Sequence, residues 1–146
     1  MNQHMERHEM IRGRIGAALR RRGTARLLHI SRILAVKEFL ELNEEQVEEL
    51  RNIRVDLARK LIKVTADIQT SRFDSFNTLS TKPVNFEQLR TNAKNVSQLR
   101  LQRKTAVIDA FEKASKLLSE EQREKLSECV AAWVDEYESE AHEPEE

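Results

Sequence analysis

Apolar residues recur at helical spacing along most of this chain. The clearest case lies between residues 43 and about 76, where the apolar positions are three, four or seven apart: Val47, Leu50, Leu57, Leu61, Val64 and Ile68. Such spacing places the side chains on one side of an α-helix. At 1.5 Å per residue this helix would be about 50 Å long. A compact globule of this chain length has a radius of gyration of about 15 Å. Because the helix is much longer than such a globule allows, we expect an elongated fold.

Two shorter segments of the chain show the same periodicity. Thr24 is a good N-cap for a helix over about residues 25–41, with Leu27, Ile30, Leu34 and the pair Phe39 and Leu40 on one side. A fourth helix is predicted from Ser119 to about Glu138. Its apolar side is formed by Leu126, Cys129, Val130, Trp133 and Tyr137.

The break between the second and third helices is residues 77–86, a polar stretch that contains Pro83. Asn85 can cap the third long helix. Its predicted stripe is Leu89, Ala93, Val96, Leu99, Val107, Ala110, Ala114 and Leu117. Two long amphipathic helices joined by a short connection should fold into an antiparallel hairpin.

Composition agrees with an all-α protein. The 146 residues include only 3 Gly and 2 Pro, with 5% aromatic and 34% charged residues, so the turn residues that a β-rich chain needs are scarce. We therefore predict an all-α fold, an elongated antiparallel helical hairpin of about four helices.

Charge divides the chain into three parts. Lys and Arg total 25, as do Asp and Glu, and this balance argues against nucleic-acid binding. Residues 1–23 are predicted to be a basic flexible arm, residues 24–138 a helical domain and residues 139–146 an acidic disordered tail. The arm contains Arg20, Arg21 and Arg22 in succession, which could contact nucleic acid or anionic lipid. The simpler interpretation is a solvated tether, or a partner for the acidic tail of a neighbouring chain. No export signal and no apolar run of membrane-spanning length is visible in the sequence.

A five-residue motif occurs twice, as LNEEQ at residues 42–46 and as LSEEQ at residues 118–122. If Asn43 and Ser119 are N-caps, Gln46 and Gln122 fall at the third helical position and can close capping boxes. The glutamates between them oppose the positive end of the helix dipole. Local physics thus explains Leu42, Asn43, Gln46, Leu118, Ser119 and Gln122 as structural residues.

The two copies resemble the paired LTxxQ motifs of the bacterial Spy/CpxP family of small envelope-stress proteins, which includes zinc-resistance-associated and nickel/cobalt-sensor relatives. The resemblance covers about residues 27–135, with Asn43 and Ser119 in place of Thr. It implies a bent helical hairpin that forms a cradle-like homodimer and has no enzymatic activity.

The function that this resemblance implies is an ATP-independent chaperone or stress-response protein that binds unfolded clients. The alternative is a metal-responsive sensor, or an accessory regulator of a membrane sensor kinase or anti-sigma system. A plain structural bundle is a third possibility. The family implies a periplasmic location, whereas the lack of a visible export signal leaves a cytoplasmic one open.

Client binding would need charge and apolar surface together. The candidate basic residues are Arg51, Arg54, Arg59, Lys60 and Lys63. The candidate apolar residues, near the turn of the hairpin, are Phe73, Phe76, Leu79 and Phe86. These could instead form the hairpin's own end-core.

Evidence for other chemistry is weak. His4 and His8 are one helical turn apart and could begin a transition-metal site, but a third or fourth ligand is not evident. The metal-sensing relatives carry His and Met where this chain has Ala110 and Ala114, so no cofactor is predicted. Cys129 is expected to be a buried small apolar residue, with an intermolecular disulfide as the alternative. No catalytic motif is found, and we predict that the protein is not an enzyme.

Overall fold

The computed structural model describes residues 29–141 of the chain. These residues form four helices and no strand: α2 (Ile30–Ala35), α3 (Glu44–Leu79), α4 (Phe86–Lys116) and α5 (Glu120–Ala141). The predicted all-α class is confirmed. The basic arm, with His4 and His8, and the last five residues of the acidic tail lie outside the described residues.

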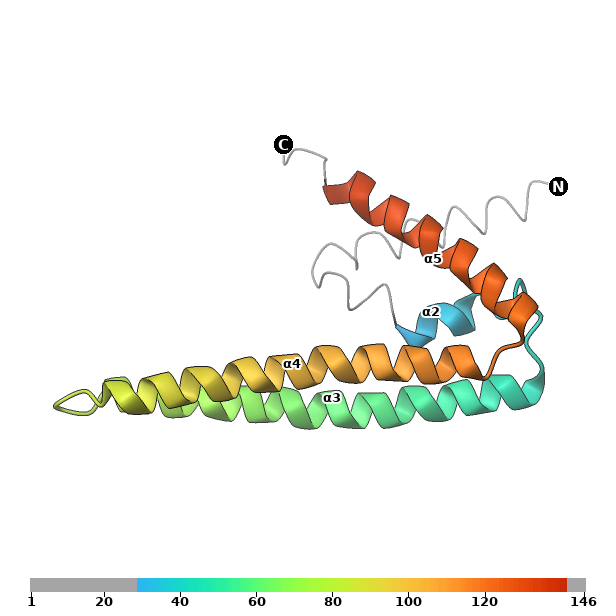
Figure 1. Ribbon diagram of the computed structural model, residues 1–146. Helices are drawn as coiled ribbons and strands as arrows, with labels where there is room; N and C mark the ends of the chain where they lie inside the picture. Colours follow the sequence, from blue (N-terminus) through green and yellow to red (C-terminus); the bar gives the residue numbers. More distant parts are fainter. Residues whose placement is uncertain (1–28, 142–146) are drawn as a thin grey trace.

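The long antiparallel hairpin is also as predicted. Figure 1 shows α3 and α4 side by side along their whole length, joined at the distal end by residues 80–85. With 36 residues, α3 is about 54 Å long. It runs three residues beyond the expected end at Phe76. Asn85 caps α4 as predicted, since its Oδ1 accepts from the Gln88 N–H at 3.0 Å.

The apolar core lies at the end of the hairpin where α3 begins and α4 ends. Here α2 packs on both long helices, and the start of α5 completes the cluster. Its buried members are Ile30, Ile33, Leu40, Leu50, Ile53, Leu57, Val107, Ala114, Leu118 and Leu126. The guanidinium of Arg32 lies 5.0 Å from the ring centroid of Trp133 and so joins α2 to α5.

The prediction of one helix over residues 25–41 was wrong at its C-terminal end. The helix ends at Ala35, and residues 36–41 form turns in which the Leu40 N–H donates to the Val36 carbonyl and the Leu42 N–H to the Lys37 carbonyl. Glu41 has φ 56°, a left-handed value that a right-handed helix cannot contain. These turns nevertheless bury Leu40, so an apolar residue at helical spacing is found here without a helix. The observed N-cap is His29, whose Nδ1 accepts from the Ser31 N–H at 3.2 Å; Thr24 lies outside the described residues.

Two smaller corrections concern the other helices. The last helix, α5, ends at Ala141, three residues beyond the end predicted near Glu138. No helix-breaking residue occurs before Pro144, so nothing in the local sequence ends the helix at Glu138. In the first half of α4, Asn92 is buried, whereas Ala93, which was predicted to lie on the apolar stripe, is exposed.

Candidate functional site

Both predicted capping boxes are present. Asn43 Oδ1 accepts from the Gln46 N–H at 2.8 Å, and Gln46 Oε1 accepts from the Asn43 N–H at 3.0 Å. In the second copy, Ser119 Oγ accepts from the Gln122 N–H at 3.2 Å and Gln122 Oε1 from the Ser119 N–H at 3.0 Å. Each box satisfies two backbone donors at the beginning of a helix.

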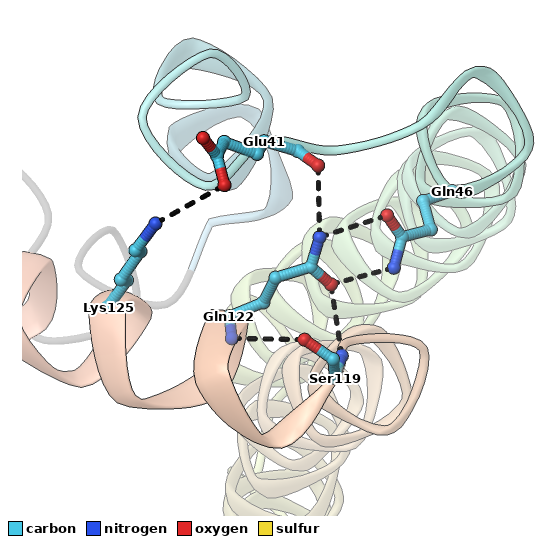
Figure 2. Close-up of polar contacts among 5 residues, drawn as sticks. All are labelled: Glu41, Gln46, Ser119, Gln122 and Lys125. Atoms are coloured by element: carbon cyan, nitrogen blue, oxygen red, sulfur yellow. Dashed lines mark hydrogen bonds and ion pairs between the residues drawn. The ribbon is translucent and has the colours of Figure 1, made fainter.

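The two glutamines also bond directly to each other, a contact that the sequence analysis missed. Gln46 Nε2 donates to Gln122 Oε1 at 2.8 Å, and Gln122 Nε2 donates to Gln46 Oε1 at 3.2 Å. Figure 2 shows the two amides facing each other between the beginnings of α3 and α5. The shared position of the glutamines within their motifs was the one signal that could have indicated this pairing.

The remaining amide hydrogens reach backbone carbonyls of the opposite copy. Gln46 donates to the Leu117 carbonyl and Gln122 to the Glu41 carbonyl, both at 3.1 Å. Each accepting residue lies two positions before the cap of its own copy, so the arrangement is nearly symmetric. The amide of each glutamine has all its donors bonded and two bonds on its oxygen. This cluster, which we call the glutamine clamp, connects the beginnings of α3 and α5 to the chain before them.

The neighbours of the clamp support it. The Lys125 Nζ lies 3.6 Å from Glu41 Oε2 and 5.9 Å from the ring centroid of Phe39. Leu118 is buried and Leu42 is partly buried against the core. The side chains of Gln46 and Gln122 bond to each other and to backbone groups, so the repeated motif acts as a structural junction.

The surface of the hairpin has two unlike faces. One face carries an open groove of about 360 Å³ between α3 and α4, which is lined by charged, polar and apolar residues. Its residues are Ile53, Asp56, Leu57, Lys60, Gln102, Thr105, Ala106, Asp109, Ala110 and Lys113. Asp67 and Asp74 follow Asp56 by three and five turns, so they continue this groove face along α3.

The other face is apolar and basic. The sequence Arg-Val-Asp at residues 54–56 recurs as Arg-Phe-Asp at residues 72–74, 18 residues and therefore five full turns later. In each triplet the Asp lies on the groove face, while the Arg and the apolar residue point away from the groove. On α4, Phe86, Leu101 and Ile108 lie within about 60° of one another around the helix.

Large apolar side chains on this second face are solvent-exposed. Their exposed fractions reach 71% at Ile62, 68% at Phe76 and 65% at Leu101. We call this surface the apolar face; its members are Val55, Ile62, Phe73, Phe76, Leu79, Phe86, Leu101 and Ile108. The predicted aromatic cluster near the turn is therefore on the surface and does not form an end-core.

The predicted basic residues are split between the two faces. Arg51 and Arg54 lie beside the apolar face, where Arg72 and Lys104 join them. Lys60 lines the groove, and Lys63, two turns after Asp56, belongs to the groove face. Arg59 is exposed and follows Val55 by one turn, so it lies on the same side of α3 as that residue.

Cys129 is half-buried on α5. Partial burial, together with the carboxylate of Glu128, raises the pKa of the Cys129 thiol above its ordinary value, so the thiol is less reactive than a free one. Among residues 29–141 no group of three His, Cys, Asp or Glu side chains could hold a metal ion. Over the same range no helix is both long and apolar enough to cross a bilayer.

Comparison with known proteins gives one match. The family described as LTXXQ motif family protein matches residues 29–129 of the chain. This range contains both copies of the motif and the whole hairpin. No curated protein and no solved structure gives a significant match.

Proposed function

Since the chain belongs to the LTXXQ motif family, we propose that it is a non-enzymatic, ATP-independent chaperone-like protein of the stress response that binds unfolded clients. The family suggests a periplasmic location and a homodimer, and both are part of the proposal.

The observation that carries the proposal is the exposure of the apolar face. Large apolar patches are seldom left exposed on monomeric soluble proteins, and where they occur they mark interaction sites. Phe73, Phe76 and Phe86 are each more than 60% exposed around the distal turn, and Ile62 and Leu101 extend the patch toward the middle of the hairpin. An unfolded client presents apolar segments that this surface could cover without a deep pocket.

The charge pattern adds a second argument. The acidic residues of the middle of the hairpin lie on or near the groove face, whereas Arg54 and Arg72 lie beside the apolar face. An extended client could therefore meet apolar and cationic groups together without opposing carboxylates. Because the contacts are spread over a rod, the surface suits a partner without fixed shape.

The test is suppression of aggregation of a denatured client. In the triple variant Ile62→Ser, Phe76→Ser, Phe86→Ser we expect most of the suppression to be lost, because three exposed apolar side chains are removed. The matched control is Lys60→Ser, Lys63→Ser, Gln102→Ser, which makes the same number of serines on the groove face. Circular dichroism and the melting temperature are the checks that both variants remain folded.

Equal suppression by both triple variants and the unaltered protein would disprove the role of the apolar face. If the unaltered protein suppresses no aggregation at equimolar ratio but captures one specific sensor or regulatory protein, the accessory-regulator alternative holds instead.

A further inference from the structure

The fully buried apolar packing between α3 and α4 does not extend to the distal turn. Of the buried apolar residues in the described part of the chain, none lies between residues 69 and 106. The core cluster lies at the opposite end of the hairpin, and Ile68, buried but outside that cluster, is the last buried apolar residue of α3. Beyond Ile68, no buried apolar core joins the two helices of the hairpin.

The positions of α3 that face α4 beyond Ile68 are polar. Ser71, Ser75 and Thr78 continue the spacing of three and four, and they alone escape full exposure between residues 69 and 78. The Ser75 hydroxyl donates to the Ser71 carbonyl at 3.0 Å and the Thr78 hydroxyl to the Asp74 carbonyl at 2.9 Å. These bonds stay within α3, so they add nothing to the attachment of α4 and weaken the helix slightly.

The corresponding position on α4 is an amide. Asn92 follows Asn85 by seven residues, and in the antiparallel arrangement this places it beside the stretch between Ser71 and Ser75. Its side chain is only 5% exposed. Oδ1 accepts from Gln88 Nε2 at 2.9 Å, but Nδ2 is buried and has no hydrogen-bond partner within the described residues. A buried amide donor without a partner favours any state in which water can reach it.

We infer that residues 69–95, the distal arm, open as a unit while the rest of the hairpin stays folded, and that Asn92 sets the stability of the closed state. Local opening is easiest where buried apolar contacts are few, which is the condition along this arm. Opening hydrates Asn92 Nδ2 and uncovers Leu89, which is partly buried and follows Phe86 by one turn on α4. This inference rests on the proposed function, because opening would regulate client binding. Opening enlarges the apolar surface that the protein offers to a client.

Hydrogen exchange of the full chain, read by mass spectrometry under native conditions, tests the opening. Helical amides of residues 69–95 should exchange at least about tenfold faster than those of residues 50–62 and 100–115, a difference of about 1.4 kcal/mol in opening free energy. Asn92→Leu should slow exchange of the arm by at least about tenfold and leave the other segments unchanged. The control is Asn95→Leu, an exposed asparagine on the same helix, which should have little effect.

Equal protection along the whole hairpin would overturn the inference, and so would equal slowing of every segment by Asn92→Leu. Asn92→Ala, which removes the amide without adding bulk, serves as the second variant if leucine disturbs packing. The link to clients has its own readout: Asn92→Leu should reduce aggregation suppression at least about twofold, and unchanged suppression with slowed exchange would disprove that link. Failure of the proposed function itself is seen separately, in the serine variants of the apolar face.

Discussion

The side-chain amides of Gln46 and Gln122, 76 residues apart in the chain, bond to each other twice, each as donor and as acceptor. Each also closes the capping box of its own helix and donates to a backbone carbonyl of the other copy. A single amide therefore takes part in helix initiation and in tertiary structure. Replacement of either glutamine leaves hydrogen-bonding groups unpaired at the other copy. The two copies together therefore stabilise the fold more than a single copy could.

Removal of the clamp should show strong coupling. We expect Gln46→Ala and Gln122→Ala each to lower the free energy of unfolding by about 2 kcal/mol, because the cap bond and the cross-copy bonds are lost together. The double variant should be less destabilised than the sum of the two by about 1 kcal/mol or more, since the bonds between the glutamines are lost only once.

Urea unfolding followed by circular dichroism measures all three changes. The control is Gln98→Ala, an exposed glutamine of α4, whose effect should stay within about 0.5 kcal/mol. Simple additivity of the two clamp variants would mean that the amides do not interact in solution.

The caps themselves make a smaller contribution. Ser119→Ala should cost about 1 kcal/mol, because the Gln122 N–H loses its acceptor. Ser119→Asp supplies another good capping oxygen and should retain most of the stability. Thermal melts distinguish the two variants, and client binding by folded Ser119→Ala should match that of the unaltered protein. A loss of binding in the folded variant would show that the serine contacts the client.

Glu41 offers a site for stabilisation. Its φ of 56° favours glycine, while the bond from Gln122 uses its backbone carbonyl and needs no side chain. Glu41→Gly and Glu41→Ala both lose the exposed ion pair with Lys125, so the comparison between them isolates the backbone. We expect the glycine variant to be more stable than the alanine variant by about 1 kcal/mol. Equal melting temperatures would show that the left-handed conformation costs little here.

The sequence predicted the hairpin well because its stripes are long and regular. The α3 stripe from Val47 to Ile68 and the caps at Asn43, Asn85 and Ser119 depend on neighbours within one or two turns, which local physics describes. The segment from Val36 to Glu41 was misread because Leu40 is buried by tertiary packing at the end of a turn, although its spacing also fits a helix.

Neither the glutamine clamp nor the division of the surface into two faces was predicted. The clamp depends on how α5 returns to the beginning of α3, a relation between residues more than 70 positions apart. The two faces could have been found from the triplets 54–56 and 72–74, had their five-turn separation been compared with the buried stripe. The basic residues of α3 instead looked like one set, because a run of charge in sequence hides its distribution around the helix.

Cys129 should titrate at a higher pH than a free thiol. Burial and the nearby Glu128 carboxylate raise its pKa in the folded state. The unfolded chain therefore loses this proton first, and stability falls as pH rises from the ordinary thiol pKa toward the raised folded value. Alkylation by iodoacetamide near pH 8 should be slower in the folded protein than in urea. Cys129→Ala should show a smaller loss of stability at alkaline pH, and an identical loss would assign the effect to other groups.

Charge reversal on the two faces should have unequal effects on client binding. Arg54→Glu with Arg72→Glu places carboxylates beside the apolar face, so binding of an acidic unfolded client should fall at least about tenfold at low salt, and the effect should shrink as salt screens the charges. Lys60→Glu with Lys63→Glu changes the net charge by the same amount on the groove face and should weaken binding far less. Fluorescence anisotropy of a labelled client at two salt concentrations measures both pairs. Equal losses would mean that the client responds to the overall charge of the protein, whereas a selective loss assigns binding to the face on which Arg54 and Arg72 flank the exposed phenylalanines.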